Sequence, residues 1–155
     1  MKRIVRSAAA TLVATLATWL AFGAAPAHAA TGSWVENQTH YNIYFDGGWA
    51  TMYFSKPPTS LPLNGLITST TIVVRPYSNG NTSETIRICY QQVYSSTDYL
   101  CWDAGTITGS TTYTPTLFNG LNARGKITIR HTLVGGTYPA TGVGVQDGVT
   151  VTYQY

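Results

Sequence analysis

Short runs in which apolar and polar side chains alternate recur along most of the chain and restrict its fold more than any other feature. The last run is the clearest: every odd position from Val149 to Tyr155 is Val or Tyr, and the even positions between them are Thr or Gln. Side chains of a β-strand point alternately to the two faces of a sheet, so this period of two predicts a strand with one buried face. Because β-branched and aromatic residues dominate the runs, the pattern indicates a protein built from strands.

Seven further runs have a similar character, and clusters of Gly, Pro, Asn, Asp and Ser separate them. They cover residues 41–45, 49–54, 63–75, 84–90, 93–102, 106–118 and 126–132. The Asp-Gly-Gly step at residues 46–48 predicts a hairpin between the first two of these runs. The apolar parity of residues 63–75 changes near residues 69–70, which predicts a bulge. About eight short strands, with no helical segment after the N-terminus, predict an all-β protein with the architecture of an antiparallel β-sandwich or a small barrel, of which we favour the sandwich.

The first 29 residues have the organisation of a secretory signal peptide. Three basic residues precede an apolar stretch over residues 8–22, and the Ala-His-Ala step at residues 27–29 offers the small side chains that signal peptidase accepts. An uncleaved membrane anchor is the alternative, but threonines interrupt the stretch, which is shorter than the roughly 20 apolar residues of a membrane span. We therefore expect a signal peptide over residues 1–29, one domain over residues 30–155, and a periplasmic or secreted protein without a lipid anchor.

Removal of the signal peptide leaves a chain without net charge. The full sequence has nine Lys and Arg residues against six Asp and Glu residues, and three of the basic residues lie within the first 29. Residues 30–155 therefore lack the positive excess that neutralises phosphates, so we expect no nucleic-acid partner. They also lack a polybasic run that would attract an anionic membrane surface.

Cys89 and Cys101 are the two cysteines of the chain. In an oxidising compartment, an isolated pair of cysteines is expected to form a disulfide. A redox-active pair is the alternative, but such pairs usually have Cys-x-x-Cys spacing and a neighbour that stabilises the thiolate. If the two residues lie opposite one another on paired strands, their bond also fixes the register of those strands.

Residues 30–155 offer few groups for catalysis. His40 and His131 are the only imidazoles there, and neither has the spacing of a metal-binding motif, so packing or solvent exposure is the expected role of both. Asp98 and Asp103 flank Cys101 and could be read as the paired carboxylates of a glycosidase, but carboxylates in turns are usually solvated. We expect no enzyme activity, no catalytic residue, no metal and no cofactor.

Five side chains are candidates for a binding surface. They are Trp49, Tyr53, Arg87, Trp102 and Arg130. The aromatic rings could stack on a sugar or anchor a protein contact, and the arginines lie in apolar runs where they could bind an anion. The alternative is that the rings pack in the core and the arginines lie on the polar face of half-exposed strands.

Several motifs occur in an order that is similar to a known family. They are Gly32-Ser33-Trp34, the run 63–74, Ile86-Arg87-Ile88-Cys89, Cys101-Trp102-Asp103 with Gly105, Thr108-Gly109, the run 126–130 and Val149-Thr150-Val151-Thr152-Tyr153. In this order and behind a signal peptide, they resemble the FlhE family of small periplasmic proteins associated with bacterial flagella. The chain departs from that pattern in a longer segment between the cysteines, a more aromatic stretch over residues 41–54 and a less basic C-terminus.

The resemblance implies a β-sandwich accessory protein of the flagellar export apparatus or rod, in a family linked to limiting proton leakage or assisting assembly. It implies a protein partner and no catalytic residues. The alternative function is that of a secreted carbohydrate-binding module, which the aromatic content and the neutral polar surface favour. A hydrolase that uses Asp98, Asp103 or a histidine is a third reading.

Overall fold

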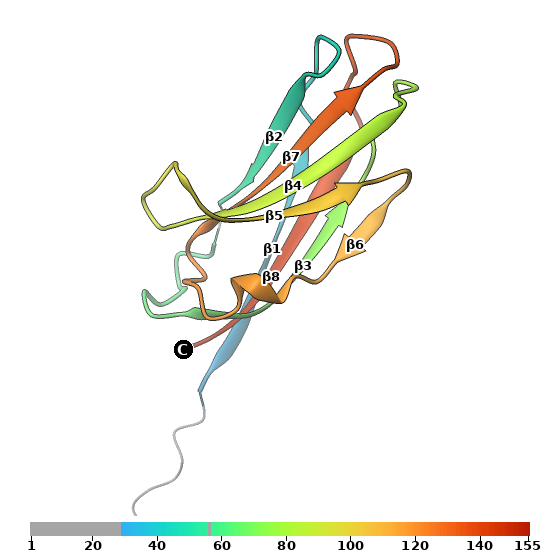
Figure 1. Cartoon of the computed structure of the whole chain (residues 1–155). Coiled ribbons are helices and arrows are strands. Elements are labelled where there is room, and N and C mark those ends of the chain that lie inside the picture. Colours follow the sequence, from blue (N-terminus) through green and yellow to red (C-terminus); the bar gives the residue numbers. More distant parts are fainter. Residues whose placement is uncertain (1–28, 56) are drawn as a thin grey trace, which may run out of the picture.

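The computed structural model describes residues 29–55 and 57–155, which form two antiparallel sheets packed face to face (Figure 1). The strands are β1 (Thr31–Thr39), β2 (Trp49–Phe54), β3 (Leu66–Val74), β4 (Ser83–Gln91), β5 (Asp98–Thr106), β6 (Thr111–Tyr113), β7 (Lys126–Val134) and β8 (Gln146–Gln154), and a 3-10 turn, η1 (Thr116–Phe118), follows β6. The predicted signal peptide lies outside the described residues, apart from its last position. Within residues 29–55 and 57–155, no helix is long and apolar enough to cross a membrane.

The two sheets have the strand orders β1-β8-β3-β6 and β2-β7-β4-β5. The C-terminal strand β8 lies inside the first sheet, where it pairs with β1 on one side and β3 on the other. In the second sheet, β7 and β4 are the inner strands and pair with each other. The prediction of an antiparallel β-sandwich is confirmed, and the last strand is paired on both sides within a sheet.

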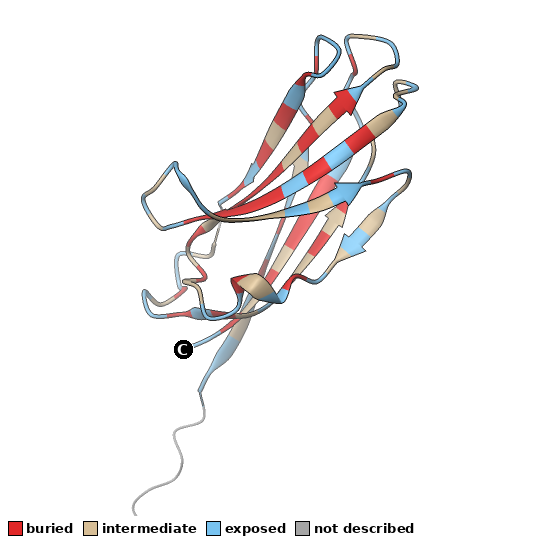
Figure 2. Cartoon of the chain, in the orientation of Figure 1, coloured by how far each residue is buried: buried red, intermediate tan, exposed pale blue. Residues whose placement is uncertain are grey.

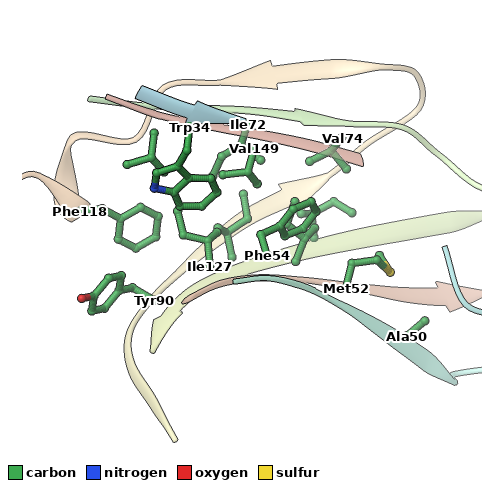
Figure 3. Close-up of a cluster of buried hydrophobic side chains, with 14 of the residues drawn as sticks. Trp34, Ala50, Met52, Phe54, Ile72, Val74, Tyr90, Phe118, Ile127 and Val149 are labelled. Atoms are coloured by element: carbon green, nitrogen blue, oxygen red, sulfur yellow. The ribbon is translucent and has the colours of Figure 1, made fainter. Parts of the chain in front are cut away.

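An apolar core fills the space between the sheets. Figure 2 shows in red the buried positions along the strands. Phe54 of β2, Ile127 of β7 and Val149 of β8 are fully buried and belong to one core cluster, which is drawn in Figure 3. Trp34 brings the edge strand β1 into the same cluster, and its indole nitrogen donates a hydrogen bond to the carbonyl oxygen of Ala123 at 3.1 Å. Burial alternates along β2 and along β8 from Val149 onward, as the period of two in the sequence predicts.

The hairpin predicted between residues 41–45 and 49–54 is wrong. The first strand is β1, and β2 pairs with β7, whereas Ile43 makes only an isolated bridge to Ala140. The turn at residues 46–48 does not fold β2 back onto residues 41–45. Instead, the N–H of Gly47 donates to the carbonyl of Leu133 and the carbonyl of Gly48 accepts from the N–H of Leu133, so the turn extends the pairing of β2 with β7. Residues 41–45 therefore bury Ile43 and leave their aromatic side chains exposed.

The predicted bulge and the predicted disulfide are both confirmed. The register of β3 against β8 shifts between Ile67 and Ser69, close to the change of apolar parity. Cys89 and Cys101 are direct partners in the ladder of β4 and β5, and they are disulfide-bonded. β5 begins at Asp98, later than the run that predicted it, because residues 92–97 form the connection between the two strands.

Replacing both cysteines with serine is expected to lower the free energy of unfolding by about 3 kcal/mol, as chain-entropy models predict for a ring of this size. The bond joins residues separated by 12 positions, so it removes many conformations from the unfolded chain. Urea unfolding of the oxidised protein, the reduced protein and the double variant would measure the loss. The reduced protein should match the variant, and equal midpoints for the oxidised and reduced forms would contradict the prediction.

Candidate functional site

Four of the five candidate surface residues lie together on the outer face of the β2-β7-β4-β5 sheet. Arg130 of β7 lies opposite Arg87 of β4 and opposite Thr51 of β2. Trp49 and Tyr53 lie two positions to either side of Thr51, so both rings share its face of the sheet. Trp49 is 60 % exposed and Tyr53 is 48 % exposed. We call these four side chains, Trp49, Tyr53, Arg87 and Arg130, the arginine-aromatic face.

Trp102 does not belong to this face. It pairs with Ile88, a core residue, and it is half-buried against the core. Its ring meets Tyr113 of β6 edge-on, with ring centroids 5.1 Å apart. This contact joins the outer strands of the two sheets, which is a packing role for Trp102.

The charges on the arginine-aromatic face are exposed and only loosely paired. One Nη of Arg87 is 3.5 Å from an oxygen of Asp103, and the two side chains are 48 % and 77 % exposed, so this ion pair contributes little to stability. The Nε of Arg130 donates to the hydroxyl of Thr51 at 3.4 Å.

The two arginines border a shallow pocket. The pocket is lined by Thr85, Ile86, Arg87, Asp103, Gly105, Arg130 and Thr132. Both guanidinium groups therefore remain available to a negatively charged or hydrogen-bonding partner.

A second group of polar residues lies inside the protein, and the sequence patterns did not predict that these residues would be buried together. The buried polar cluster consists of Glu84, His131, Asp147 and His40, whose side chains have no exposed surface. His131 stands at its centre, with Nδ1 2.5 Å from an oxygen of Glu84 and Nε2 2.8 Å from an oxygen of Asp147. The two sheets are thereby joined, because His131 and Glu84 belong to one sheet and Asp147 belongs to the other.

Backbone groups hold the two carboxylates of the buried polar cluster. The N–H of Tyr77 donates to Glu84 at 2.9 Å, and the N–H of Arg75 donates to Asp147 at 2.9 Å. His40 completes the cluster, with Nε2 2.9 Å from the same oxygen of Asp147 and its ring centroid 4.5 Å from that of His131. The carboxylates are therefore fixed in position by the connection between β3 and β4.

The cluster shifts the pKa values of its central pair in opposite directions. Burial alone would lower the pKa of His131, but its hydrogen bonds and charge interactions with Asp147 and Glu84 raise the pKa above its ordinary value. Burial alone would raise the pKa of Asp147, but its contacts with His131 and His40 lower it below its ordinary value. The contacts with the two carboxylates therefore favour the protonated form of His131.

Sequence spacing does not reveal the carboxylates that surround the two histidines. Glu84 and Asp147 are far from His40 and His131 in sequence, and the fold brings them together. Asp98 and Asp103 behave differently, because each is exposed and contacts a different neighbour. Gln91 donates to Asp98 at 3.0 Å, and Asp103 faces Arg87.

Comparisons with known proteins bear on the fold. No family model matches the chain, and no curated protein matches it. A crystal structure of FlhE is similar to the chain, with 19 % identity, a TM-score of 0.56, and coverage of 81 % of this chain and 99 % of that one. Structures of tomato aspermy virus (9 % identity, 94 % of each chain, TM-score 0.45) and turnip yellow mosaic virus (10 % identity, 84 % of this chain and 83 % of that one, TM-score 0.42) are more distant. The described chain thus has an FlhE-like fold.

Proposed function

We propose that this protein is a non-enzymatic, exported accessory protein of the FlhE type, which acts in the periplasm by protein contact at the flagellar export apparatus or rod. The observation that carries the proposal is the similarity of fold to FlhE over nearly the whole of that chain. The order of motifs in the sequence supports the same assignment. Assistance to assembly, or restriction of proton leakage, is the role this assignment implies.

The placement of the titratable side chains supports a function without catalysis. His40 and His131 have no exposed side-chain surface, so a substrate in solution cannot reach either imidazole in the folded chain. Asp98 and Asp103 are exposed but engage separate partners in place of forming a carboxylate pair. General acid-base chemistry needs a titratable group within hydrogen-bond reach of the substrate.

The arginine-aromatic face is the surface that we propose for the protein contact. Trp, Tyr and Arg are the residue types that most often dominate the binding energy of protein interfaces. Here they stand on three neighbouring strands, with the two arginines side by side and the two rings along β2. Because β2 is an edge strand, a partner could contact the rings and approach the edge at the same time.

The carbohydrate-binding alternative rests on the same two exposed rings. Trp49 and Tyr53 share a face and could stack on a sugar. A glycan panel separates the two functions: saturable glycan binding that is lost in Trp49→Ala would favour the carbohydrate-binding module.

Substituting the arginine-aromatic face is expected to weaken partner binding by roughly 30-fold or more for each dominant side chain, which corresponds to about 2 kcal/mol. The variants are Trp49→Ala and Arg130→Glu, and the control is Val35→Glu on β1, which is exposed in the other sheet. Wild-type and variant proteins would be used to capture partners from envelope extracts of a flagellated host. They would also be tested for complementation of a deletion strain by measuring motility and cytoplasmic pH.

Loss of capture and complementation in the two face variants, with both retained in Val35→Glu, would support the proposal. Unchanged motility and cytoplasmic pH in the deletion strain would contradict the flagellar assignment. Equal loss in all three variants would contradict the choice of surface.

A further inference from the structure

We infer that His40, His131 and Asp147 of the buried polar cluster form a binding site for one divalent transition-metal ion of the zinc class. One nitrogen from each histidine and one oxygen from the aspartate all lie within 4.8 Å of one another. Two imidazoles and a carboxylate are a donor set typical of zinc, whereas calcium and magnesium prefer oxygen ligands. This inference does not depend on the proposed flagellar function.

The state of His40 is the observation that points to a ligand. Its Nδ1 is buried without a hydrogen-bond partner in the described chain, and its Nε2, 2.9 Å from an oxygen of Asp147, does not have the geometry of a full hydrogen bond. A buried polar group that makes no hydrogen bond is costly, and native proteins rarely keep one. A metal ion beside Asp147 would provide a partner for Nε2.

Glu84 has the position of an outer carboxylate of a metal site. It contacts Nδ1 of His131 and leaves Nε2, on the other side of the ring, directed at Asp147. Metal-binding histidines usually donate their second N–H to such a carboxylate, which fixes the tautomer and the ring orientation. Glu84 is itself held by the N–H of Tyr77 at 2.9 Å and by the amide of Asn81 at 3.4 Å.

The charge of the cluster matches a divalent ion. Glu84 and Asp147 bring two negative charges into a region without solvent, and one ion with two positive charges neutralises them while both imidazoles are uncharged. The two imidazole rings lie close together, with centroids 4.5 Å apart, so one ion beside Asp147 could bind a nitrogen of each.

The metal-bound geometry requires a small adjustment of the ligands. The nitrogen of His131 and the oxygen of Asp147 are 2.8 Å apart, which is a hydrogen-bond length. Ligands at zinc-bond lengths in a tetrahedral arrangement are about 3.3 Å apart, so the ion must displace the proton and separate the two atoms by about half an ångström. Asp147 has one oxygen near each histidine and could offer both to the ion.

Stoichiometric metal in the natively exported, untagged protein is the first expected result, measured by elemental analysis. After chelator treatment, Zn²⁺ or Co²⁺ should bind with one ion per chain, and Co²⁺ should give the visible absorption of a tetrahedral site. A concentration of Zn²⁺ about 100-fold above its Kd should raise the Tm by about 10 °C. No bound metal, together with no Tm shift and no tetrahedral Co²⁺ spectrum, would overturn the inference and leave a cluster neutralised by protons.

Two variants localise the ion. His40→Gln keeps a polar side chain and removes a ligand, so we expect it to lose the tetrahedral Co²⁺ spectrum and at least 10-fold in Zn²⁺ affinity. Thr70→Val is the matched control, because Thr70 is also buried with an unpartnered hydroxyl but is not among the candidate ligands. An unchanged spectrum and affinity in His40→Gln would overturn the site. If His40→Gln does not fold, the metal content and the Co²⁺ spectrum of the wild-type protein decide the question.

Discussion

Replacing His131 with leucine is expected to lower the free energy of unfolding of the chelator-treated protein by about 3–5 kcal/mol, the cost of leaving buried charges without their partner. The imidazole lies between Glu84 and Asp147, with both contacts at hydrogen-bond length and none of the three side chains exposed. Leucine fills a similar volume, so the loss would come from the two carboxylates and only slightly from packing. Urea unfolding followed by tryptophan fluorescence would measure the change.

The control for this prediction removes the charges together with the histidine. In the triple variant Glu84→Gln, His131→Leu, Asp147→Asn, each amide keeps an oxygen that can accept the backbone N–H now bound by the carboxylate. We therefore expect the triple variant to recover much of the stability that His131→Leu loses. A loss of under about 1 kcal/mol in the single variant would show that the cluster does not hold two charged carboxylates.

Local patterns predict the strands whose inward positions are apolar. β8 and β7 are found where the alternation predicts them, because residues such as Val149, Val151 and Ile129 are all fully buried. β1 is missed for the opposite reason. Trp34 is its only large apolar side chain facing the core, and Glu36 is the next inward residue, so the strand has no apolar period to detect. Its pairing with β8 depends on contacts between the two ends of the chain.

The candidate surface could be predicted in part because parity alone places Trp49 and Tyr53 on one face. The position of Trp102 also follows from parity: Cys101 forms its disulfide on the outer face of the ladder, so its neighbour must face inward. The buried polar cluster could not be predicted from spacing. The sequence does show that Glu84, His131 and Asp147 each take a position of a strand that points into the core. Only the register between the strands shows that these three side chains meet.

Replacing Phe54 with alanine is expected to cost about 3–5 kcal/mol of unfolding free energy, because the ring is fully buried and its removal leaves a cavity. Phe54 ends β2, pairs with Ile127 and projects into the centre of the core (Figure 3). Tyr53→Ala is the matched control, since the adjacent ring is 48 % exposed on the opposite side of the same strand. We expect that control to change stability by less than about 1 kcal/mol.

The variants Phe54→Ala and Tyr53→Ala also distinguish the packing role of β2 from its proposed role in partner binding. If inward residues hold the sheets together and outward residues contact a partner, Phe54→Ala lowers the urea midpoint, whereas Tyr53→Ala keeps the midpoint and weakens partner capture. Chemical denaturation and capture from envelope extracts would be measured on both variants. Similar losses of stability in the two variants would mean that the Tyr53 ring packs against the fold in solution and would remove it from the arginine-aromatic face.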